Sequence, residues 1–470
     1  MKAVELKNIS FKYNDDTCIF NNASFCVDFG EVVLVSGHSG EGKSTLISII
    51  SGIIPNVNYG EIEGDVLIQG ENIKDKKLSY VCKKVGIVLQ NADAQIINKY
   101  VEDEIAFACE NIAMPQDNMQ KQISIVCNIL KLNPKDKTRT LSGGQKQRVI
   151  TASTLAMGQK ILILDEPLAN LDKDGAKKLM DVLTSLAKRG YAVIIVEHRL
   201  DVVMPYVDKI YHVGDKTIKL IKDKEQYLLS QTKKVIYETK NVESKDIIFK
   251  LENVGYSIKG KEILKDISFD INRGSRVVLL GENGVGKTTL VRILSRLQKP
   301  TEGSVQQFID KDFNKKLYSK KKWFKKVGIV YQNPDYQLFM PTVRKEIAFG
   351  IKDEQKIDKI LNIFGLKEFE NYHPQSLSEG QKRRLTIAAV AGYEPDVLVL
   401  DEPTVGQDYK VLQEMIAILN KLHEETKNTM ITITHDARCA KALCDRAIIL
   451  RKNGEVIVGG PDAVDKYFGN

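Results

Sequence analysis

An internal repeat constrains the fold of this chain more than any other feature of its sequence. Three landmarks occur twice in the same order: a glycine-rich loop ending in lysine at 43 or 287, a Leu-Ser-x-Gly-Gln stretch at 141–145 or 377–381, and an apolar run followed by Asp-Glu at 161–166 or 397–402. The second copies follow the first at offsets of 244, 236 and 236 residues. Because unrelated motifs have no reason to keep their spacing, the repeat indicates a duplicated domain.

We therefore predict two domains, at residues 1–230 and 247–470, joined by a polar, lysine-rich linker at 231–246. The chain of 470 residues is long enough for two domains, and its 43% of hydrophobic residues is ordinary for a globular protein. A linker of this length spans about 50 Å at most, so each half is expected to meet the other before it meets another chain. The net charge of +8 is a mild basic excess that identifies no partner.

Each half is expected to have an α/β core. Apolar runs at 32–35, 161–164 and 193–196 do not alternate with polar residues, as in strands that are buried on both faces of a parallel sheet. The alternating stretch 23–29 predicts an antiparallel, half-exposed strand, and helical spacing is present at 174–188 and 409–424. The seven cysteines lack paired spacing, which favours reduced thiols in a cytosolic protein, and no apolar run approaches the ~20 residues of a membrane span.

The glycine-rich loops have the arrangement that phosphate binding needs, because each follows an apolar run and precedes a helical stretch. Lys43 and Lys287 are expected to reach the β- and γ-phosphates, and Ser44 and Thr288 to bind Mg²⁺. The alternative, a glycine turn with a surface lysine, does not account for two matches at one repeat offset. The expected phosphate-binding residues are Gly37, His38, Ser39, Gly40, Glu41, Gly42, Lys43, Ser44 and Thr45, and Gly281, Glu282, Asn283, Gly284, Val285, Gly286, Lys287, Thr288 and Thr289.

An Asp-Glu pair ends an apolar run in each half. A carboxylate at this edge of a sheet is suited to hold Mg²⁺ through water, a role expected of Asp165 and Asp401. Glu166 and Glu402 follow directly and are candidates for the general base that polarises a water molecule against the γ-phosphate. Acidic residues also commonly end strands without any function, but here both pairs accompany a phosphate loop.

Together these residues resemble the ATP-binding cassette ATPases, whose signature is Leu-Ser-x-Gly-Gln between a phosphate loop and an Asp-Glu strand. The resemblance covers both halves, and it implies two P-loop RecA-like parallel-sheet cores, each with an antiparallel β subdomain and a helical signature subdomain. It also implies that the signature of one half contacts the ATP bound by the other half. The signature residues are Ser142, Gly143, Gly144 and Gln145 facing the ATP on Lys287, and Ser378, Gly380 and Gln381 facing the ATP on Lys43.

The resemblance assigns roles to further pairs of residues. Gln90 and Gln332 match the glutamine that senses Mg²⁺ and the attacking water, His198 and His435 the γ-phosphate histidine, Asp172 and Asp408 the aspartates that cross the dimer interface, and Tyr13 and Tyr256 the aromatic residue that stacks on adenine. For the two tyrosines a core or surface role fits nearly as well.

Two residues of the second half depart from the family pattern. Glu379 replaces a signature glycine, and Gln407 replaces the usual leucine before Asp408. Since both halves keep the lysine, the Asp-Glu pair, the glutamine and the histidine, we predict two hydrolytic sites, with Mg²⁺ and ATP as cofactors.

The segment after the glutamine resembles the cytoplasmic ATPases of energy-coupling factor importers of vitamins and cobalt. In these, a short helix lines a groove for a membrane scaffold, which makes Asp93 and Asp335 candidate partners for scaffold arginines; a solvated capping aspartate is the alternative. The implied partners are an integral-membrane scaffold and a separate substrate-binding membrane subunit, at the cytoplasmic face of the cell membrane, and no nucleic acid is expected. A ribosomal translation factor, a tandem sugar-import ATPase and a non-hydrolysing nucleotide switch remain alternatives.

Overall fold

The computed structural model describes residues 1–14, 17–89, 92–141, 143–169, 171, 173–231, 246–308, 323, 325–452 and 454–469. The chain forms two compact units, Met1–Lys233 and Lys234–Asn470, which are described separately. The predicted linker lies almost wholly outside the described residues, and the predicted domain boundaries stay a prediction.

The first unit contains two sheets. The antiparallel sheet has the strand order β2-β1-β4-β5, and the six-stranded sheet has the order β10-β9-β3-β8-β7-β6 and is parallel except for β10. The strands are β1 (Lys2–Tyr13), β2 (Cys18–Asp28), β3 (Val32–Ser36), β4 (Gly60–Ile68), β5 (Glu71–Asn72), β6 (Val85–Val88), β7 (Ile161–Asp165), β8 (Ala192–Val196), β9 (Lys209–Gly214) and β10 (Thr217–Ile221). The helices are α1 (Lys43–Ile50), α2 (Ile53–Asn56), α3 (Leu78–Val81), α4 (Ala92–Gln95), α5 (Val101–Asn111), α6 (Gln116–Leu130), α7 (Gly143–Ala156), α8 (Lys173–Lys188), α9 (Leu200–Val203) and α10 (Lys224–Gln231), with 3-10 turns η1 (Thr138–Thr140) and η2 (Met204–Tyr206).

The second unit repeats this architecture. Its antiparallel sheet has the order β12-β11-β14, and its six-stranded sheet has the order β15-β16-β17-β13-β18-β19. The strands are β11 (Ile247–Ile258), β12 (Lys261–Asn272), β13 (Arg276–Gly281), β14 (Glu302–Gln307), β15 (Val327–Val330), β16 (Val397–Asp401), β17 (Thr429–Ile433), β18 (Arg446–Leu450) and β19 (Val456–Gly459). The helices are α11 (Lys287–Leu294), α13 (Val343–Ala348), α14 (Glu354–Ile363), α15 (Glu379–Ala391), α16 (Tyr409–Thr426), α17 (Ala437–Ala442) and α18 (Pro461–Phe468), with 3-10 turns η3 (Pro334–Tyr336), η4 (Lys367–Phe369) and η5 (Pro374–Ser376).

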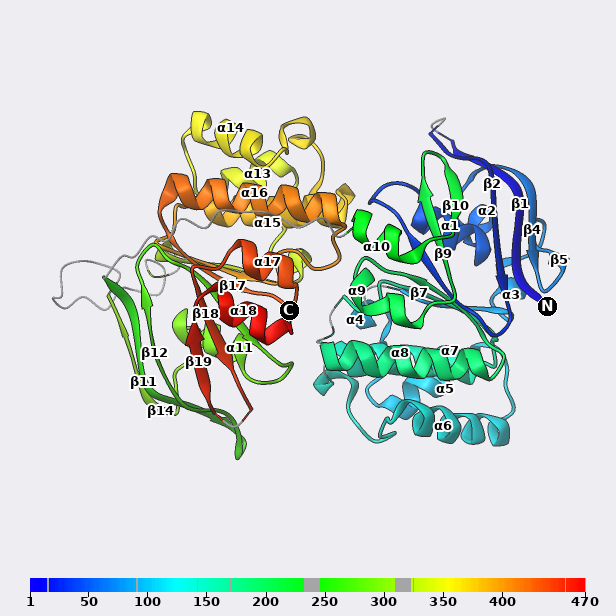
Figure 1. Ribbon diagram of the computed structural model, residues 1–470, viewed down its shortest axis with the longest axis horizontal. Helices are drawn as coiled ribbons and strands as arrows, with labels where there is room; N and C mark the ends of the chain where they lie inside the picture. The colour runs from blue at the N-terminus through cyan, green and yellow to red at the C-terminus, as the bar shows by residue number, and fades with distance from the viewer. Residues whose placement is uncertain are drawn as a thin grey trace. The chain divides into compact units, whose positions relative to one another are not determined.

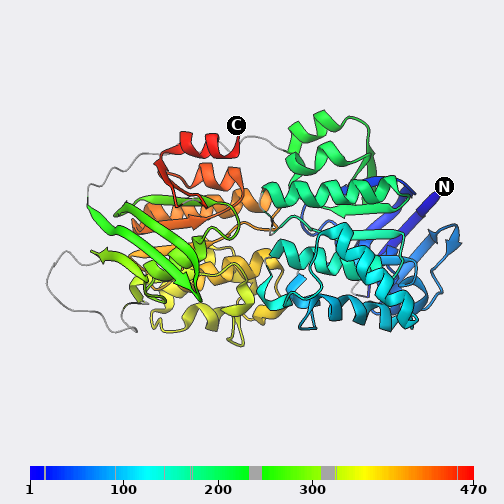
Figure 2. The same cartoon turned by 90° about the horizontal axis from the view of Figure 1, so that it is seen from below.

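Each central sheet is buried on both faces, as the apolar runs predict. Along β3, Val32 and Leu34 contribute to one hydrophobic cluster, and Val33 and Val35 to the cluster on the other face. The predicted antiparallel strand at 23–29 corresponds to the second half of β2, which ends at Asp28 and in which buried residues alternate with more exposed ones. Figure 1 shows that in the second unit the antiparallel sheet and the helices α13 to α16 lie at opposite ends of the unit, and Figure 2 shows the same elements turned by 90°. The predicted α/β fold class with antiparallel and helical subdomains is confirmed.

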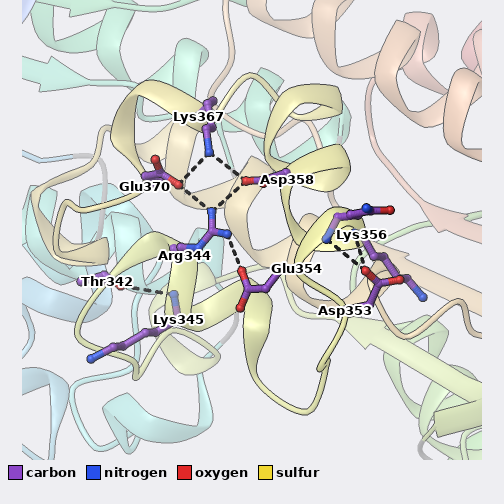
Figure 3. Close-up of polar contacts among 10 residues, drawn as sticks. Thr342, Arg344, Lys345, Asp353, Glu354, Lys356, Asp358, Lys367 and Glu370 are labelled. Carbon is purple, nitrogen blue, oxygen red and sulfur yellow. Dashed lines mark hydrogen bonds and ion pairs between the residues drawn. The ribbon is translucent and has the colours of Figure 1, made fainter.

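An ion-pair network ties the helical part of the second unit together. The guanidinium group of Arg344 on α13 lies 2.5 Å from a carboxylate oxygen of Glu354, 2.8 Å from one of Asp358 and 2.7 Å from one of Glu370 (Figure 3). Lys367 pairs with the last two. In the first unit Glu102 stands at the position equivalent to Arg344, as the matching backbone hydrogen bonds of the two residues show. Because Glu102 is acidic, it cannot form this network, which therefore belongs to the second half.

Among the described residues, no helix combines the length and the apolarity that crossing a bilayer requires.

Candidate nucleotide sites

Each candidate phosphate loop connects a buried parallel strand to a helix. The loops lie between β3 and α1 and between β13 and α11. Gly42 and Gly286 precede these helices at φ +102° and +100°, and a Cβ atom there would lie 2.5 Å from side chains of the antiparallel sheet, so both positions require glycine. Around Gly40 and Gly284, in contrast, a Cβ atom would meet nothing within 4 Å. The loops are therefore packed on one side and open on the other.

The loop lysines point into the loops in both halves. The ammonium group of Lys43 donates hydrogen bonds to the carbonyl oxygens of Gly37, at 2.9 Å, and His38, at 2.8 Å. Lys287 makes the same bonds to Gly281, at 2.7 Å, and Glu282, at 3.0 Å. Both lysines are buried. A buried ammonium group that is held by the carbonyl groups of a glycine loop is placed to bind an anion that enters the loop.

The Asp-Glu pairs lie at the carboxyl ends of β7 and β16, as predicted. Burial raises the pKa of Asp165 to about 6, with a further contribution from Glu166, while Lys43 opposes the shift. Burial also raises the pKa of Asp401, against the effect of Lys287. In each unit the loop lysine therefore favours the charged form of this carboxyl group, and a divalent cation would favour it further.

Both candidate general bases occupy a strained backbone position. Glu166 and Glu402 have φ values of 47° and 52°, in the left-handed region that non-glycine residues seldom adopt. The strain is the same in both halves, and their N–H groups donate to Val196 and Ile433 of the neighbouring strands. Strain of this kind persists where the surroundings over-determine it and is common at functional sites.

A histidine lies next to each glutamate. The Nε2 atom of His198 is 3.4 Å from Oε1 of Glu166, and that of His435 is 3.6 Å from Oε1 of Glu402. In the second half the His435 ring also hydrogen-bonds Asn283 of the phosphate loop at 3.0 Å. In the second unit the phosphate loop, the strand that ends in Asp401 and the strand before His435 therefore meet at one place, and in the first unit the corresponding histidine and glutamate lie side by side.

Burial and the adjacent Asp401 raise the pKa of Glu402 to about 8. Its Oε1 atom is buried and accepts no hydrogen bond among the described residues. A buried carboxylate oxygen without a donor, beside an open phosphate loop, fits a site that a nucleotide, a cation and water complete.

The structure describes the whole signature segment of the second half, and that of the first half without Ser142. Ser378 caps α15 in a capping box with Gln381, so the helix N-terminus is fully formed. The Glu379 side chain is exposed and its Oε1 atom lies 3.6 Å from the ammonium group of Lys382, one turn along the helix. In the first half, Gly143, Gly144 and Gln145 begin α7.

Four predicted residues lie outside the described part of the chain or are described only by their backbone. Gln90, Ser142 and Asp172 are outside it, and nothing is described of the Asp93 side chain.

The remaining predicted residues have different surroundings. Tyr13 hydrogen-bonds Thr45 of α1 at 3.0 Å, whereas Tyr256 packs against the hydrophobic core of the second unit. Gln332 is exposed just after β15. Asp408 caps α16 through the N–H of Val411, and Gln407 beside it is buried with no hydrogen bond to its amide group among the described residues.

Sequence reasoning missed Glu197, which lies between Val196 and His198. It is buried, and burial followed by the charge of Glu166 raises its pKa. Its carboxylate accepts N–H groups of His198, Arg199 and Leu168, and thereby shapes the turn that carries the histidine. The second half has Thr434 at the position equivalent to Glu197. Aligning the two halves would have shown this difference next to the histidine and pointed to Glu197.

Comparison with known proteins agrees with this geometry. A family model described as "ABC transporter" matches residues 20–169 and 264–405. The chain belongs to the ABC transporter family and is an ATPase with two tandem cassettes.

Similar proteins span nearly the whole chain. An ABC transporter ATP-binding protein of Methanosarcina mazei, so named provisionally, is 30% identical over 531 residues, which cover 98% of this chain and 89% of the relative. YkoD of Bacillus subtilis, provisionally named an HMP/thiamine import ATP-binding protein, is 31% identical over 502 residues, covering 97% and 91%. A chain in a model of ribosome-bound archaeal Pelota and ABCE1 has a TM-score of 0.74 at 20% identity, covering 98% of this chain and 80% of its own, and this likeness shows the fold alone.

Proposed function

We propose that this ATPase is the energy-coupling subunit of a membrane importer of the energy-coupling factor type. In this proposal two ATP molecules with Mg²⁺ join the halves, each held by the phosphate loop of one half and the signature helix of the other. Hydrolysis then releases the halves, and this motion drives an integral-membrane scaffold at the cytoplasmic face of the membrane. A separate membrane subunit selects the substrate, which is a vitamin, a vitamin precursor or a transition-metal ion.

The chain's own residues have defined roles in this proposal. Lys43 and Lys287 bind the phosphates, and Glu166 and Glu402 take the proton of the attacking water, with His198 and His435 beside them. Mg²⁺, when bound, neutralises charge on the phosphates. Burial and Asp401 raise the pKa of Glu402, so this residue acts as a base only after it loses its proton.

The observation that carries the proposal is an exposed apolar patch after the candidate glutamine in each half. In the second half Tyr336, Phe339 and Phe349 are 75%, 67% and 51% exposed, and we call these residues the aromatic patch. The rings of Phe339 and Phe349 pack edge to face at 5.4 Å. In the first half Ile97 and Phe107 are exposed at the equivalent positions. Large apolar side chains gathered on a surface are typical of a site that another protein covers.

The patch is held in shape by a buried glutamate. In the second half Glu346 accepts the N–H groups of Phe339, at 2.9 Å, and Met340, at 2.8 Å. Glu104 does the same in the first half for Ile97 and Asn98. Because both halves fix this loop by the same bonds, the patch is a preformed feature, which suits repeated docking of a partner.

An ion pair connects the aromatic patch to the signature helix. The carboxylate of Asp335, next to the patch, lies 3.1 Å from the ammonium group of Lys382, which is nearly buried on α15 one turn after Ser378. Lys382 also donates to Gln375 at 3.1 Å. A basic side chain from a scaffold helix that bound Asp335 would compete with Lys382, which gives a docked partner a direct route to the signature helix.

The test removes the apolar patch without touching the nucleotide sites. The combined variant Ile97→Ser and Phe339→Ser is expected to keep ATP turnover in solution and to lose a multi-span membrane protein that co-purifies with the wild type from gently solubilised membranes. Tyr59→Ser, which replaces an equally exposed aromatic residue away from the patches, is the matched control. Retention of the membrane partner by the patch variant, or co-purification of ribosomes with the wild type, would contradict the proposal.

A further inference from the structure

A buried polar contact lies behind the phosphate loop of the first half. Ser36 at the end of β3 pairs in register with His212 on β9. The hydroxyl of Tyr227 on α10 lies 2.8 Å from Nδ1 of His212 and also hydrogen-bonds the Ser36 side chain. Ser36 and Tyr227 are buried. We call Ser36, His212 and Tyr227 the Ser–His–Tyr set.

The second half has an apolar set at the same place. Leu280 at the end of β13 pairs in register with Ile449 on β18, the positions equivalent to Ser36 and His212. Val464 of α18 takes the place of Tyr227, and all three residues are buried in one hydrophobic cluster. The repeat thus provides two versions of one junction, polar in the first unit and apolar in the second.

Packing alone does not require the polar version. Buried polar groups contribute little to net stability compared with well-packed apolar groups, and the second half forms the same strands and helix without them. The three groups of the first half must be mutually oriented to satisfy one another. Burial lowers the pKa of His212, which favours its neutral imidazole, and the Nδ1 atom and the Tyr227 hydroxyl share a hydrogen bond in which the imidazole tautomer decides the donor. The hydrogen bonds among these three side chains therefore fix the position of α10 relative to β3 and β9.

That geometry borders the phosphate loop. Gly37 follows Ser36, and a Cβ atom on Gly37 would lie 2.2 Å from the carbonyl oxygen of Val213, so β9 is in direct contact with the start of the loop. The other side of the imidazole faces Glu41 of the loop: a Cβ atom on Gly214 would lie 2.9 Å from Nε2 of His212 and 3.1 Å from Oε2 of Glu41. Glu41 in turn accepts the N–H of His38 at 2.8 Å, and the His38 and His212 rings are 6.5 Å apart.

We propose that His212 and Tyr227 are positioning residues for the first nucleotide site, which hold the start of its phosphate loop and tie the loop to α10. They affect ATP binding by holding the loop backbone, to which Lys43 also hydrogen-bonds, and they do not contact the nucleotide. In the second half the three equivalent residues are apolar, and the phosphate loop instead pairs through Glu282 with Lys452, which follows β18. The two sites therefore respond differently to movement of the helix that ends at Gln231, just before the segment that joins the two units.

The experiment compares hydroxyl removal with transplantation of the apolar set. Tyr227→Phe and the triple variant Ser36→Leu, His212→Ile, Tyr227→Val are made in the full chain with Lys287→Ala, so that the first site dominates binding of a fluorescent ATP analogue. We expect both to weaken binding about 3- to 10-fold, the scale of one lost hydrogen bond. The same changes combined with Lys43→Ala are expected to leave binding at the second site unchanged.

Two controls separate positioning from folding. Tyr211→Phe removes a buried hydroxyl from the same strand that bonds the Cys26 carbonyl at 2.9 Å, and it is expected to keep wild-type binding at the first site. Melting temperatures are measured for every variant, because a purely structural role predicts that the triple variant, with the apolar packing of the second half, restores both stability and affinity. Wild-type affinity at the first site in Tyr227→Phe or in the triple variant overturns the proposal. If the triple variant fails to fold, the ATP affinity of Tyr227→Phe at the first site decides whether the proposal holds.

Discussion

The protonation of Glu402 makes the second unit sensitive to pH, and Glu402→Gln tests this. The side chain is 5% exposed, and its pKa lies at about 8 against an ordinary value of 4.5 because burial, and then Asp401, disfavour its charged form. Between these two values the folded state keeps the proton and the unfolded state has lost it. The folded state then binds more protons, so the free energy of unfolding falls as the pH rises.

The size of the effect follows from the width of this window. One pH unit corresponds to about 1.4 kcal/mol for a group that is protonated only in the folded state. Between pH 5 and pH 7 the wild type therefore loses about 2.7 kcal/mol through this carboxyl group, an order-of-magnitude figure. Glutamine resembles the protonated acid and does not titrate, so Glu402→Gln avoids the loss. For a unit of this length the difference corresponds to roughly 5–10 °C in melting temperature.

Differential scanning calorimetry of the full chain without nucleotide, at pH 5, 6, 7 and 8, measures the effect on the second unit. The advantage of Glu402→Gln over the wild type is expected to grow up to about pH 8 and then to stay constant. Glu424→Gln, an exposed site on α16, controls for loss of one carboxylate. An advantage of Glu402→Gln that does not change from pH 5 to pH 8 would refute the argument, because it would mean that this buried carboxyl is already ionised at pH 5.

Three further predictions concern single side chains. Glu166→Gln is expected to reduce ATP turnover at least tenfold at its own site while ATP still binds, because a general base contributes about 10²–10⁴-fold; unchanged steady-state turnover would remove Glu166 from the mechanism. Tyr13→Phe is expected to keep ATP affinity and Tyr13→Ala to lose it about tenfold if this ring stacks on adenine, and equal affinities in a binding titration would show that it does not. Arg344→Met is expected to lower the melting temperature of the second unit by a few degrees in low salt and by less in 1 M NaCl, and a salt-independent effect would mean that lost packing, not charge pairing, is responsible.

Much of the fold was predictable because its signals are local. The glycine loops, the unalternating strands and the Asp-Glu pairs are runs of neighbouring residues, and duplication showed each of them twice. The helices predicted at 174–188 and 409–424 correspond to α8 and α16 within a few residues. Strand order was implied only by the family resemblance, since no short stretch of sequence records which strands are neighbours.

The contacts that sequence reasoning missed join residues far apart in the chain. Lys382 and Asp335 are 47 residues apart, and Ser36 meets Tyr227 only because β9 and α10 return to the end of β3. A lysine within a signature helix and a tyrosine near a helix end are ordinary residues in the sequence. Their roles depend on burial and on a partner, and neither property can be read from residue spacing alone.

Several differences between the two halves lie next to the candidate nucleotide-binding residues. The second half has Glu379 in its signature and Thr434 before its histidine, whereas the first has glycine and the buried Glu197 there. Among the residues that the structure describes, the Ser–His–Tyr set occurs in the first half and the Arg344 network in the second. Both halves have the same fold, so these differences are not needed to build it. A chain that keeps both sets of catalytic candidates while changing the residues that support them is suited to two hydrolytic sites with unequal nucleotide affinities, and the paired Lys43→Ala and Lys287→Ala backgrounds measure that inequality directly.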